Sequence, residues 1–384
     1  MNDRSGRESP ALSAYSSAFS GGVLAVHAHP DDESLATGGL LATFAAAGRP
    51  ACVVTCTRGE RGEVIALPGT TSAGLAGLEG DGPALGAHRE TELADALTRL
   101  ADGTGNRVEH AFLDALPSSG RRFAGSDEPG SRRYEDSGMA WVAPGVAGPA
   151  PDSPPTAFAR VPLDESAGRL AALVRARRPA VVATYEPGGG YGHPDHVRAH
   201  QVTVRALELA ADPAWRPDGE DGPVRDGEPR TAGRRDEPWA GAELWQTVTP
   251  EAELRTARAT LAALPDALTL ATAEGLTFAA PEADLPPLAK AGLPPWSAGR
   301  QEVGSPGYRS PDELPIMRTG RVVRVAVGPV VSRVVGALRA HATQVQHATA
   351  LTRPVGPVAG WYALSNGVLA PILTAETYLV GRPG

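Results

Sequence analysis

The run GVLAVHAHPDDE at residues 22–33 decides how this chain is expected to fold. Residues 23–27 are mostly apolar and predict a strand, and the polar residues begin where that strand ends. A strand that is apolar on both faces is typical of a parallel sheet covered by helices. Polar residues just after such a strand lie at the carboxyl edge of the sheet, where α/β proteins bind ligands.

A second run has the same form. The strand-like segment 180–185 (AVVATY) is followed by EPGGGYGHPDH at residues 186–196. Each run therefore places His and Asp side chains after a predicted buried strand. One His-Pro-Asp turn alone would most often be structural, with Asp capping the next helix. Two such turns, each after an apolar strand, predict a shared functional site.

The rest of the chain alternates helix-like and strand-like segments, which favours one sheet with helices on both faces. We expect an α/β fold, namely a Rossmann-like, mostly parallel sheet with helices on both faces, polar insertions and a smaller C-terminal α+β part. The predicted helices are 33–47, 85–101, 163–176, 194–209, 250–264 and 330–345. The predicted strands are 23–27, 50–57, 110–113, 180–185, 243–248, 322–327, 361–364 and 378–380.

The expected organisation follows from composition along the chain. Residues 1–20 are predicted to be a disordered tail, and 21–210 a Rossmann-like catalytic domain that carries the metal site. Residues 211–384 are expected to complete the fold. Within them, 212–238 and 277–310 read as insertions because they are rich in Pro and Gly or in charge.

Composition excludes several classes of protein. The net charge of −8 over 384 residues, with no basic run, argues against a nucleic-acid partner. No apolar run reaches the roughly 18 residues needed to span a bilayer, so no membrane partner is expected. The two cysteines, Cys52 and Cys56, are interpreted as buried core residues. We expect a cytoplasmic protein, and the sequence leaves the oligomeric state open.

His29, Asp32 and His196 are the predicted metal ligands. Two imidazoles and one carboxylate leave the fourth tetrahedral position of Zn²⁺ open for water, as in catalytic zinc sites. We expect one zinc ion per subunit, with another divalent ion such as Fe²⁺ as an alternative.

Four nearby residues are the predicted catalytic groups. Asp31, beside the ligands, is expected to take the proton of the attacking water. Tyr191 and His193 are expected to face the oxygen that gains negative charge. Asp195 is expected to hold the His193 ring and to favour its protonated form.

The other histidines are not predicted to bind the metal. His200 lies four residues after His196 and is either a partner of the ligands or exposed. The remaining ones lack a partner at metal-binding spacing and are interpreted as structural, including His341.

These runs resemble the N-acetylglucosaminyl-phosphatidylinositol de-N-acetylase family, also called LmbE-like, and are most similar to its actinobacterial mycothiol-biosynthesis branch. The similar stretches span nearly the whole chain outside the polar insertions: 27–35, 53–64 (VVTCTRGERGEV), 89–93 (RETEL), 136–140 (DSGMA), 184–200, 340–345 (AHATQV) and 363–366 (ALSN).

The resemblance implies the same metal ligands and the same catalytic groups. It further implies that Arg89 and Asp136 hold sugar and inositol hydroxyls, and that Glu63 lines the pocket. The implied substrate is a small amino-sugar–inositol molecule. The implied reaction is hydrolysis of the N-acetyl amide of N-acetylglucosaminyl-inositol to glucosaminyl-inositol and acetate.

Three alternatives remain open. The first is the related amidase that cleaves mycothiol S-conjugates, although it favours a Lys shortly after the first motif, and residues 35–37 (LAT) contain none. The second is a deacetylase of another N-acetyl sugar. The third is a sugar-binding protein without catalysis, which would have no need of Asp31 as a base beside the metal.

Overall fold

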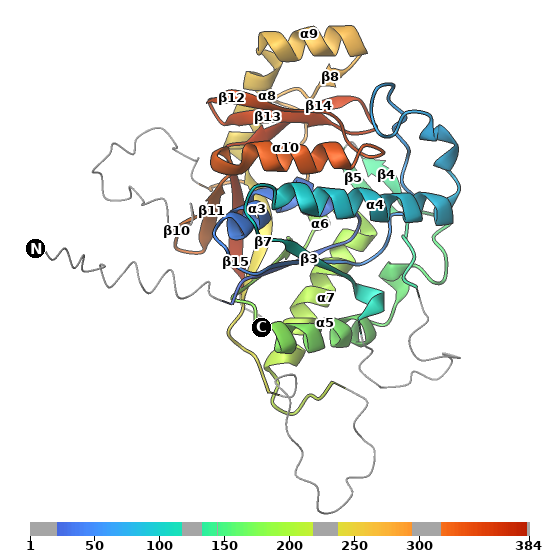
Figure 1. Cartoon of the computed structure of the whole chain (residues 1–384), viewed down its shortest axis with the longest axis vertical. Helices are drawn as coiled ribbons and strands as arrows, with labels where there is room; N and C mark the ends of the chain where they lie inside the picture. The colour runs from blue at the N-terminus through green and yellow to red at the C-terminus, as the bar shows by residue number, and fades with distance from the viewer. Residues whose placement is uncertain (1–20, 117–132, 144, 218–236, 294–315, 382–384) are drawn as a thin grey trace, which may run out of the picture.

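A nine-stranded sheet forms the centre of the molecule (Figure 1). The computed structural model describes residues 21–116, 133–143, 145–217, 237–293 and 316–381. The strands in chain order are β1 (Val23–His27), β2 (Ala51–Thr55), β3 (Val108–Phe112), β4 (Met139–Ala143), β5 (Val146–Pro149), β6 (Val181–Tyr185), β7 (Glu243–Pro250), β8 (Thr277–Phe278), β9 (Ala289–Lys290), β10 (Ile316–Thr319), β11 (Val322–Ala326), β12 (Gln346–Val355), β13 (Val358–Ala363), β14 (Val368–Leu373) and β15 (Ala375–Gly381).

Helices cover both faces of this sheet. The α-helices are α2 (Asp32–Ala36), α3 (Gly38–Ala46), α4 (Gly82–Leu100), α5 (Leu163–Arg177), α6 (Gly189–Gly192), α7 (Pro194–Ala211), α8 (Glu251–Ala262), α9 (Pro265–Glu274) and α10 (Val331–Ala340). The 3₁₀-helices are η1 (Leu75–Leu78), η2 (Leu113–Ala115), η3 (Phe158–Arg160) and η4 (Gly328–Val330). In Figure 1, α3, α4 and α10 lie on one side of the sheet, and α5 and α7 lie on the other.

The strand order places the two sequence runs side by side. Along the main path the order is β10-β11-β15-β7-β6-β1-β2-β3. The five strands from β7 to β3 are parallel, and β15, β11 and β10 continue the sheet in antiparallel fashion. The predicted mostly parallel α/β fold is therefore confirmed. The chain leaves β1 toward β2 on one side and returns as β6 on the other, so the carboxyl ends of β1 and β6 flank a switch point, where ligands bind in such sheets.

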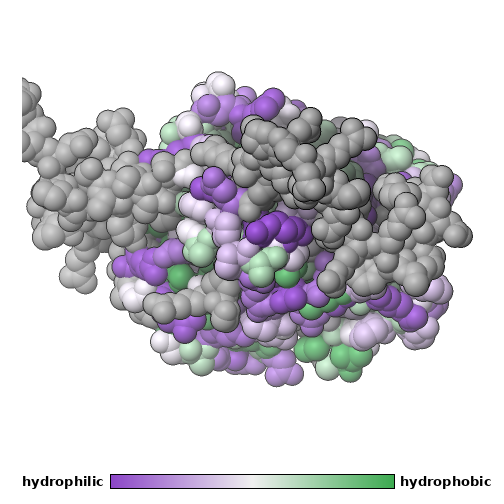
Figure 2. Space-filling view, turned by 90° about the horizontal axis from the view of Figure 1, so that it is seen from below, coloured by the Kyte–Doolittle hydropathy of each residue, from purple (hydrophilic) through white to green (hydrophobic). Residues whose placement is uncertain are grey.

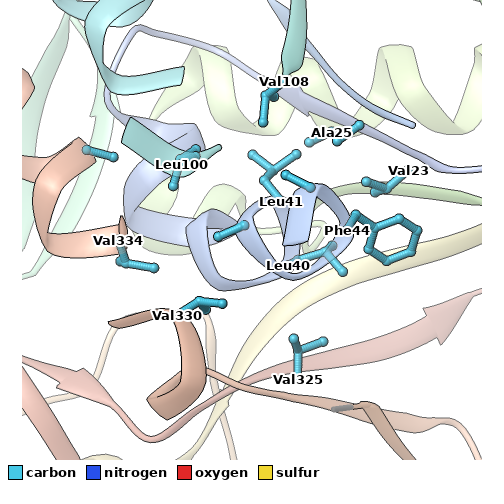
Figure 3. Packing of buried hydrophobic residues seen from close by; sticks show 14 of the residues in the cluster. Val23, Ala25, Leu40, Leu41, Phe44, Leu100, Val108, Val325, Val330 and Val334 are labelled. Atoms are coloured by element: carbon cyan, nitrogen blue, oxygen red, sulfur yellow. The ribbon is translucent and has the colours of Figure 1, made fainter. Parts of the chain in front are cut away.

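Side chains alternate along β1 between the two faces of the sheet. Val23 and Ala25 pack in a cluster with the helix α3, and Leu24 and Val26 pack in a second cluster on the other face. Figure 3 shows the first cluster, in which Leu41 of α3 lies near Ala25. Both faces of β1 are thus buried, as expected for a central parallel strand.

Truncation of this core should destabilise the fold strongly. Leu41 is fully buried, so Leu41→Ala should lower the free energy of unfolding by about 2–5 kcal/mol. Leu268→Ala is the matched control, because Leu268 is 45% exposed on α9 and its loss should cost less than about 0.5 kcal/mol. Urea unfolding of both variants would measure the difference, and equal losses would contradict this account of the core.

A second sheet was not predicted. It has the order β12-β13-β14-β8, and a separate apolar cluster joins it to α8 and α9. The predicted strand at 361–364 corresponds to part of β13, but β12, β14 and the hairpin β4–β5 were missed. Strands β7, β10, β11 and β15, all after residue 210, belong to the central sheet, while β12 to β14 belong to the second sheet. The proposed division of the chain at residue 210 stays a prediction.

Two predicted helices differ most from the observed ones. The helix expected at 33–47 is interrupted at Thr37, whose Oγ1 lies 2.8 Å from Nε2 of His27 and which precedes two glycines. The helix expected at 330–345 ends at Ala340. The AHATQV stretch at 340–345 therefore lies mostly outside the helix, and His341 within it is buried in the protein interior.

Hydrophilic side chains predominate on the face shown in Figure 2, with hydrophobic residues in small groups between them. Within the described ranges, none of the helices has the length and apolar character to cross a membrane. Cys52 and Cys56 are free and buried, as predicted.

Candidate active site

The first loop of the site follows β1 and turns at Pro30. Asp31 adopts a φ of 124°, a conformation that costs free energy in a residue other than glycine and is found mostly at functional sites. Its N–H donates to Oε2 of Glu33 at 3.0 Å. Asp32 begins the helix α2, and its Oδ2 accepts the N–H of His29 at 2.9 Å. The turn thereby directs Asp32 toward His29 and Asp31 toward Arg89.

The second loop follows β6 and contains three glycines. Gly189 has a φ of +65°, and a Cβ there would lie 2.7 Å from the N of Val197, so only glycine fits. Backbone conformation and close packing explain this glycine. Pro194 occupies the first turn of α7, which places His196 at the start of that helix.

The two loops bring the three predicted ligands together. Nδ1 of His29 lies 3.3 Å from Nε2 of His196. Oδ2 of Asp32 lies 3.3 Å from Nδ1 of His29, and its Oδ1 lies 3.4 Å from Nε2 of His196. A tetrahedral Zn²⁺ with ligand bonds of about 2.0–2.1 Å holds neighbouring ligand atoms about 3.3–3.4 Å apart. The two nitrogens meet this spacing, and each has one Asp32 oxygen at a similar distance, Oδ2 for His29 and Oδ1 for His196, so these side chains could hold a metal ion.

The outer nitrogens of both imidazoles support the same conclusion. Nε2 of His29 lies 3.3 Å from Oδ2 of Asp195, and Nδ1 of His196 lies 3.1 Å from the carbonyl oxygen of Gly189. When the outer nitrogen of each ring carries the proton and donates a hydrogen bond, the nitrogen that faces the other ring keeps a lone pair, which can bind a metal ion. Metal-binding histidines are commonly held in this way.

Other possible metal-binding groups lie close to His29. One ligand atom from each of His29, His193 and His196 lies within 4.8 Å of the others, and the same holds for His29, Asp136 and Asp195. Asp195 and Asp136 face Nε2 of His29, away from His196. Asp32, the predicted third ligand, has one oxygen at 3.3 Å from His29 and the other at 3.4 Å from His196, and it supplies a negative charge.

Charge in the site is concentrated on buried carboxylates. Burial opposes ionisation of Asp32, but His196 and His29 hold its pKa well below the usual range. Burial also opposes protonation of His29, yet Asp136, Asp195 and Asp32 raise its pKa well above the usual value. Both shifts express the preference of this site for a positive charge between its carboxylates, which a bound divalent cation would supply.

Asp31 lies at the edge of the carboxylate group. Burial raises its pKa to about 6, and Asp32 adds to this effect, whereas Arg89 opposes it. The Oδ1 of Asp31 lies 3.3 Å from Nη2 of Arg89. A carboxylate with a raised pKa can both accept and return a proton near neutral pH, which suits a base that later acts as an acid.

The expected contact between Asp195 and His193 is wrong. The carboxylate of Asp195 contacts His29 and accepts from the N–H and the hydroxyl of Ser137. The Nδ1 of His193 accepts instead from the backbone N–H of Asp195 at 3.2 Å. Burial, aided by His29 and His196, lowers the pKa of His193 well below its usual value. His193 is therefore neutral with the proton on Nε2, and it remains a hydrogen-bond donor in that form.

Aromatic rings complete the wall beside the ligands. The Tyr191 ring lies 5.1 Å from the ring of His196 in an edge-to-face contact. Tyr185 stacks on His196 at 4.2 Å, and its hydroxyl accepts the N–H of Ala28 at 2.9 Å. The role of Tyr185 was missed, although it ends the strand before the second loop. His200 is buried and contacts the carbonyl oxygen of Tyr185 at 2.9 Å.

The three predicted substrate-binding residues lie in different settings. Arg89 is buried and donates to the carbonyl oxygens of Pro30 and Gly59, while its Nε is buried without a partner among the described residues. Asp136 is buried, and its Oδ1 lies 3.7 Å from Nε2 of His29. Glu63 is exposed, and its carbonyl oxygen accepts from Gln344 at 3.0 Å.

A buried pair behind the base was missed by sequence reasoning. Nε2 of His341 lies 2.7 Å from Oε1 of Glu33, and both side chains are fully buried. Glu33 in turn holds the N–H of Asp31. The pair thus supports the strained turn, and the signal in the sequence was the family-like AHATQV stretch.

His341→Gln should destabilise the protein in a pH-dependent way. Burial alone would raise the pKa of Glu33, but His341 lowers it to about 2, so this stabilisation exists above about pH 4.5 and is lost as pH falls through 2. Burial opposes protonation of His341, but Glu33 raises its pKa above 6.5, so its stabilisation is lost as pH rises through that raised value.

We expect a loss of about 3 kcal/mol at pH 5.5, because a buried carboxylate loses its partner, and a smaller loss at pH 9. Urea unfolding at both pH values would measure it. The double variant Glu33→Gln/His341→Gln should recover part of the loss, since no unpaired carboxylate remains. The same loss at both pH values would show that the pair carries no charge.

Comparison with known proteins places the chain in a family. The PIG-L family model, described as GlcNAc-PI de-N-acetylase, matches residues 24–207. A protein of Kineococcus radiotolerans named 1D-myo-inositol 2-acetamido-2-deoxy-alpha-D-glucopyranoside deacetylase is 38% identical over 93% of this chain and 76% of its own length. A Rhodococcus erythropolis protein of the same name is 34% identical over 93% of this chain and 90% of its own length.

Among solved structures, a deacetylase in complex with teicoplanin shares 17% identity and a TM-score of 0.41, over 94% of this chain and 98% of that chain. That similarity is too low to bear on function. The identities to the curated relatives, over nearly the whole length of this chain, establish the relationship. The chain belongs to the PIG-L family of GlcNAc-PI de-N-acetylases, and it is an enzyme of the amide-hydrolase class.

Proposed function

We propose that this enzyme removes the acetyl group from N-acetylglucosaminyl-inositol in mycothiol biosynthesis, with Zn²⁺ held by His29, Asp32 and His196. The single observation that carries the metal assignment is the set of ligand-atom distances of 3.3–3.4 Å among these three side chains. The names of the relatives support the choice of substrate.

The residues of the chain divide the reaction between them. When bound, Zn²⁺ supplies a Lewis acid that polarises the amide carbonyl and makes water more acidic. Asp31 takes the proton of the attacking water and later returns it to the departing amine. His193 donates from Nε2 to the oxygen that gains charge, and Tyr191 stands beside it. Asp195 holds the outer nitrogen of the ligand His29, which is its proposed role in place of the one first expected.

Arg89 is proposed to act on both the base and the substrate. Its Nη2 lies 3.3 Å from Oδ1 of Asp31, so a substrate hydroxyl bound beside the base would lie close to the guanidinium. Asp136 accepts from the N–H of Gly138 at 2.8 Å, and its Oδ1 lies 3.7 Å from Nε2 of His29. A substrate with hydroxyls on both rings would satisfy such groups, and losing these hydrogen bonds would cost affinity.

One comparison tests this function against the related amidase. Acetate release from N-acetylglucosaminyl-inositol and cleavage of a mycothiol S-conjugate are measured on the same metal-loaded preparation. We expect kcat/KM for acetate release to exceed that for the conjugate. The reverse order would assign the amidase activity, and hydrolysis of N-acetylglucosamine alone at the same rate would assign a broader deacetylase.

A further inference from the structure

A cavity of about 420 Å³ opens beside the ligands Asp32 and His196, and the proposed reaction leaves most of it unused. It lies between the carboxyl edge of the central sheet and the second sheet. Residues of α2, β7, α8, α10 and β14 line it, together with Tyr185 and Tyr191. Sites for small molecules commonly have volumes of about 300–1,000 Å³, so this space is far larger than one methyl group requires.

The lining of this cavity is mostly apolar. Six of the residues that face it are Leu35, Leu254, Leu288, Val334, Leu364 and Ile372. Apart from the ligands Asp32 and His196, the charged side chains among the described lining residues are Arg258 and Glu376. Glu376 already accepts from the N–H groups of Gly39 and Leu40 at 2.6 and 2.8 Å and from the hydroxyl of Tyr378 at 2.6 Å. Uncharged polar groups, among them Thr247, Thr249 and Asn366, are a minority of the lining, so the cavity favours an apolar group over a hydroxyl-rich ring.

The polar groups of the site lie in another direction. Asp31, Arg89 and Asp136 are absent from the lining of the cavity, and so is His193. The ligand cluster therefore separates a polar region from an apolar one. An amide carbonyl bound at that cluster has two substituents, which are its amine part and its acyl part. The hydroxyl-bearing amine part suits the polar region, and the acyl part is left to face the cavity.

We propose that this cavity is a binding site for the acyl part of the substrate, and that the enzyme hydrolyses amides with straight acyl chains longer than acetyl. This inference rests on the proposed function, because it places the scissile carbonyl at His29, Asp32 and His196. The chemical class of substrate is an N-acylated glucosaminyl-inositol with an apolar chain of about four to eight carbons. Water adds to the carbonyl carbon, the C–N bond breaks, and the products are a fatty carboxylate and the free amine.

A chain-length series on the unmodified enzyme is the first test. Release of glucosaminyl-inositol is measured from its N-acetyl, N-butanoyl, N-hexanoyl and N-octanoyl forms. Each buried methylene should raise kcat/KM by about two- to fourfold until the cavity is filled. A fall of more than tenfold from acetyl to butanoyl would overturn the proposal while leaving the proposed deacetylase function intact.

A variant that narrows the cavity is the second test. Ala370 lies in β14 and lines the cavity, so Ala370→Phe should lower the ratio of hexanoyl to acetyl kcat/KM by at least tenfold. Ala252→Phe is the matched control, because Ala252 is exposed on α8 and does not line the cavity. An unchanged ratio in a folded Ala370→Phe protein that still releases acetate would overturn the proposal.

Carboxylate binding supplies a readout that does not depend on hydrolysis. Acetate, butanoate, hexanoate and octanoate are titrated into the zinc-loaded enzyme, and binding is followed by the rise in Tm. We expect Kd to fall by about two- to fourfold per methylene. If no amide is hydrolysed but Kd falls in this way, the proposed function fails and the cavity assignment stands. Equal Kd values from acetate to octanoate would reject the cavity assignment whatever the activity.

Discussion

Asp31→Asn is expected to retain the metal and to lower kcat by roughly 10²–10⁴-fold, the usual contribution of a general acid–base group. The side chain lies beside the ligand cluster and carries a pKa raised to about 6 by burial, which suits proton transfer in both directions. The amide is similar in size to the carboxylate, so the strained turn can be kept. Metal content and acetate release should be measured on the same sample.

Asp266→Asn is the control for this change, because Asp266 is exposed in the first turn of α9. It should retain both metal and rate. If Asp31→Asn loses the metal, Asp31 is a ligand and the assignment of the base is wrong. If it keeps the rate, another group removes the proton.

His196→Ala should lose the metal and lower the rate by about 10³-fold or more, because a Lewis-acid metal supplies several kcal/mol to such reactions. Its Nε2 is the atom that lies within 3.3 Å of His29 and 3.4 Å of Asp32. The ring is also stacked on Tyr185, so a modest loss of stability should accompany the change.

His88→Ala is the matched control, because His88 lies on α4 and pairs with Glu92 at 3.4 Å, outside the ligand cluster. It should keep its metal. Metal analysis of both purified variants measures the outcome. A His196→Ala protein with a full complement of metal would show that His193 has replaced it or that the ligand set is different.

The sequence predicted the central sheet well because its signals there are local. Apolar strands bounded by Pro and Gly gave β1 and β6 almost to the residue, and the polar residues after them marked the switch point. The three predicted ligands were chosen because the spacing within each loop is distinctive. The distances among them depend on the pairing of β1 with β6, which no local pattern gives.

Two of the errors involve contacts between residues that are far apart in the sequence. Asp195 was expected to hold His193, yet its carboxylate turns toward His29, 166 residues earlier in the chain. The Glu33–His341 pair joins residues 308 apart and was invisible to motif spacing. The second sheet was missed because β12 mixes polar and apolar residues and pairs with β13 through bulges, whereas β14 is apolar throughout but contains Pro371, which argues against a strand. Tertiary packing decided each of these cases.

The central claim is that one metal ion at His29, Asp32 and His196 supports hydrolysis of the acetyl amide. Its most direct test is a titration of Zn²⁺ into protein stripped by a chelator, with acetate release from N-acetylglucosaminyl-inositol as the readout. We predict no release without metal, then a rate that rises with added Zn²⁺ and reaches its plateau at about one equivalent per chain. Full activity in the stripped protein, or no activity at any level of Zn²⁺, Fe²⁺ or another divalent ion, would contradict the claim.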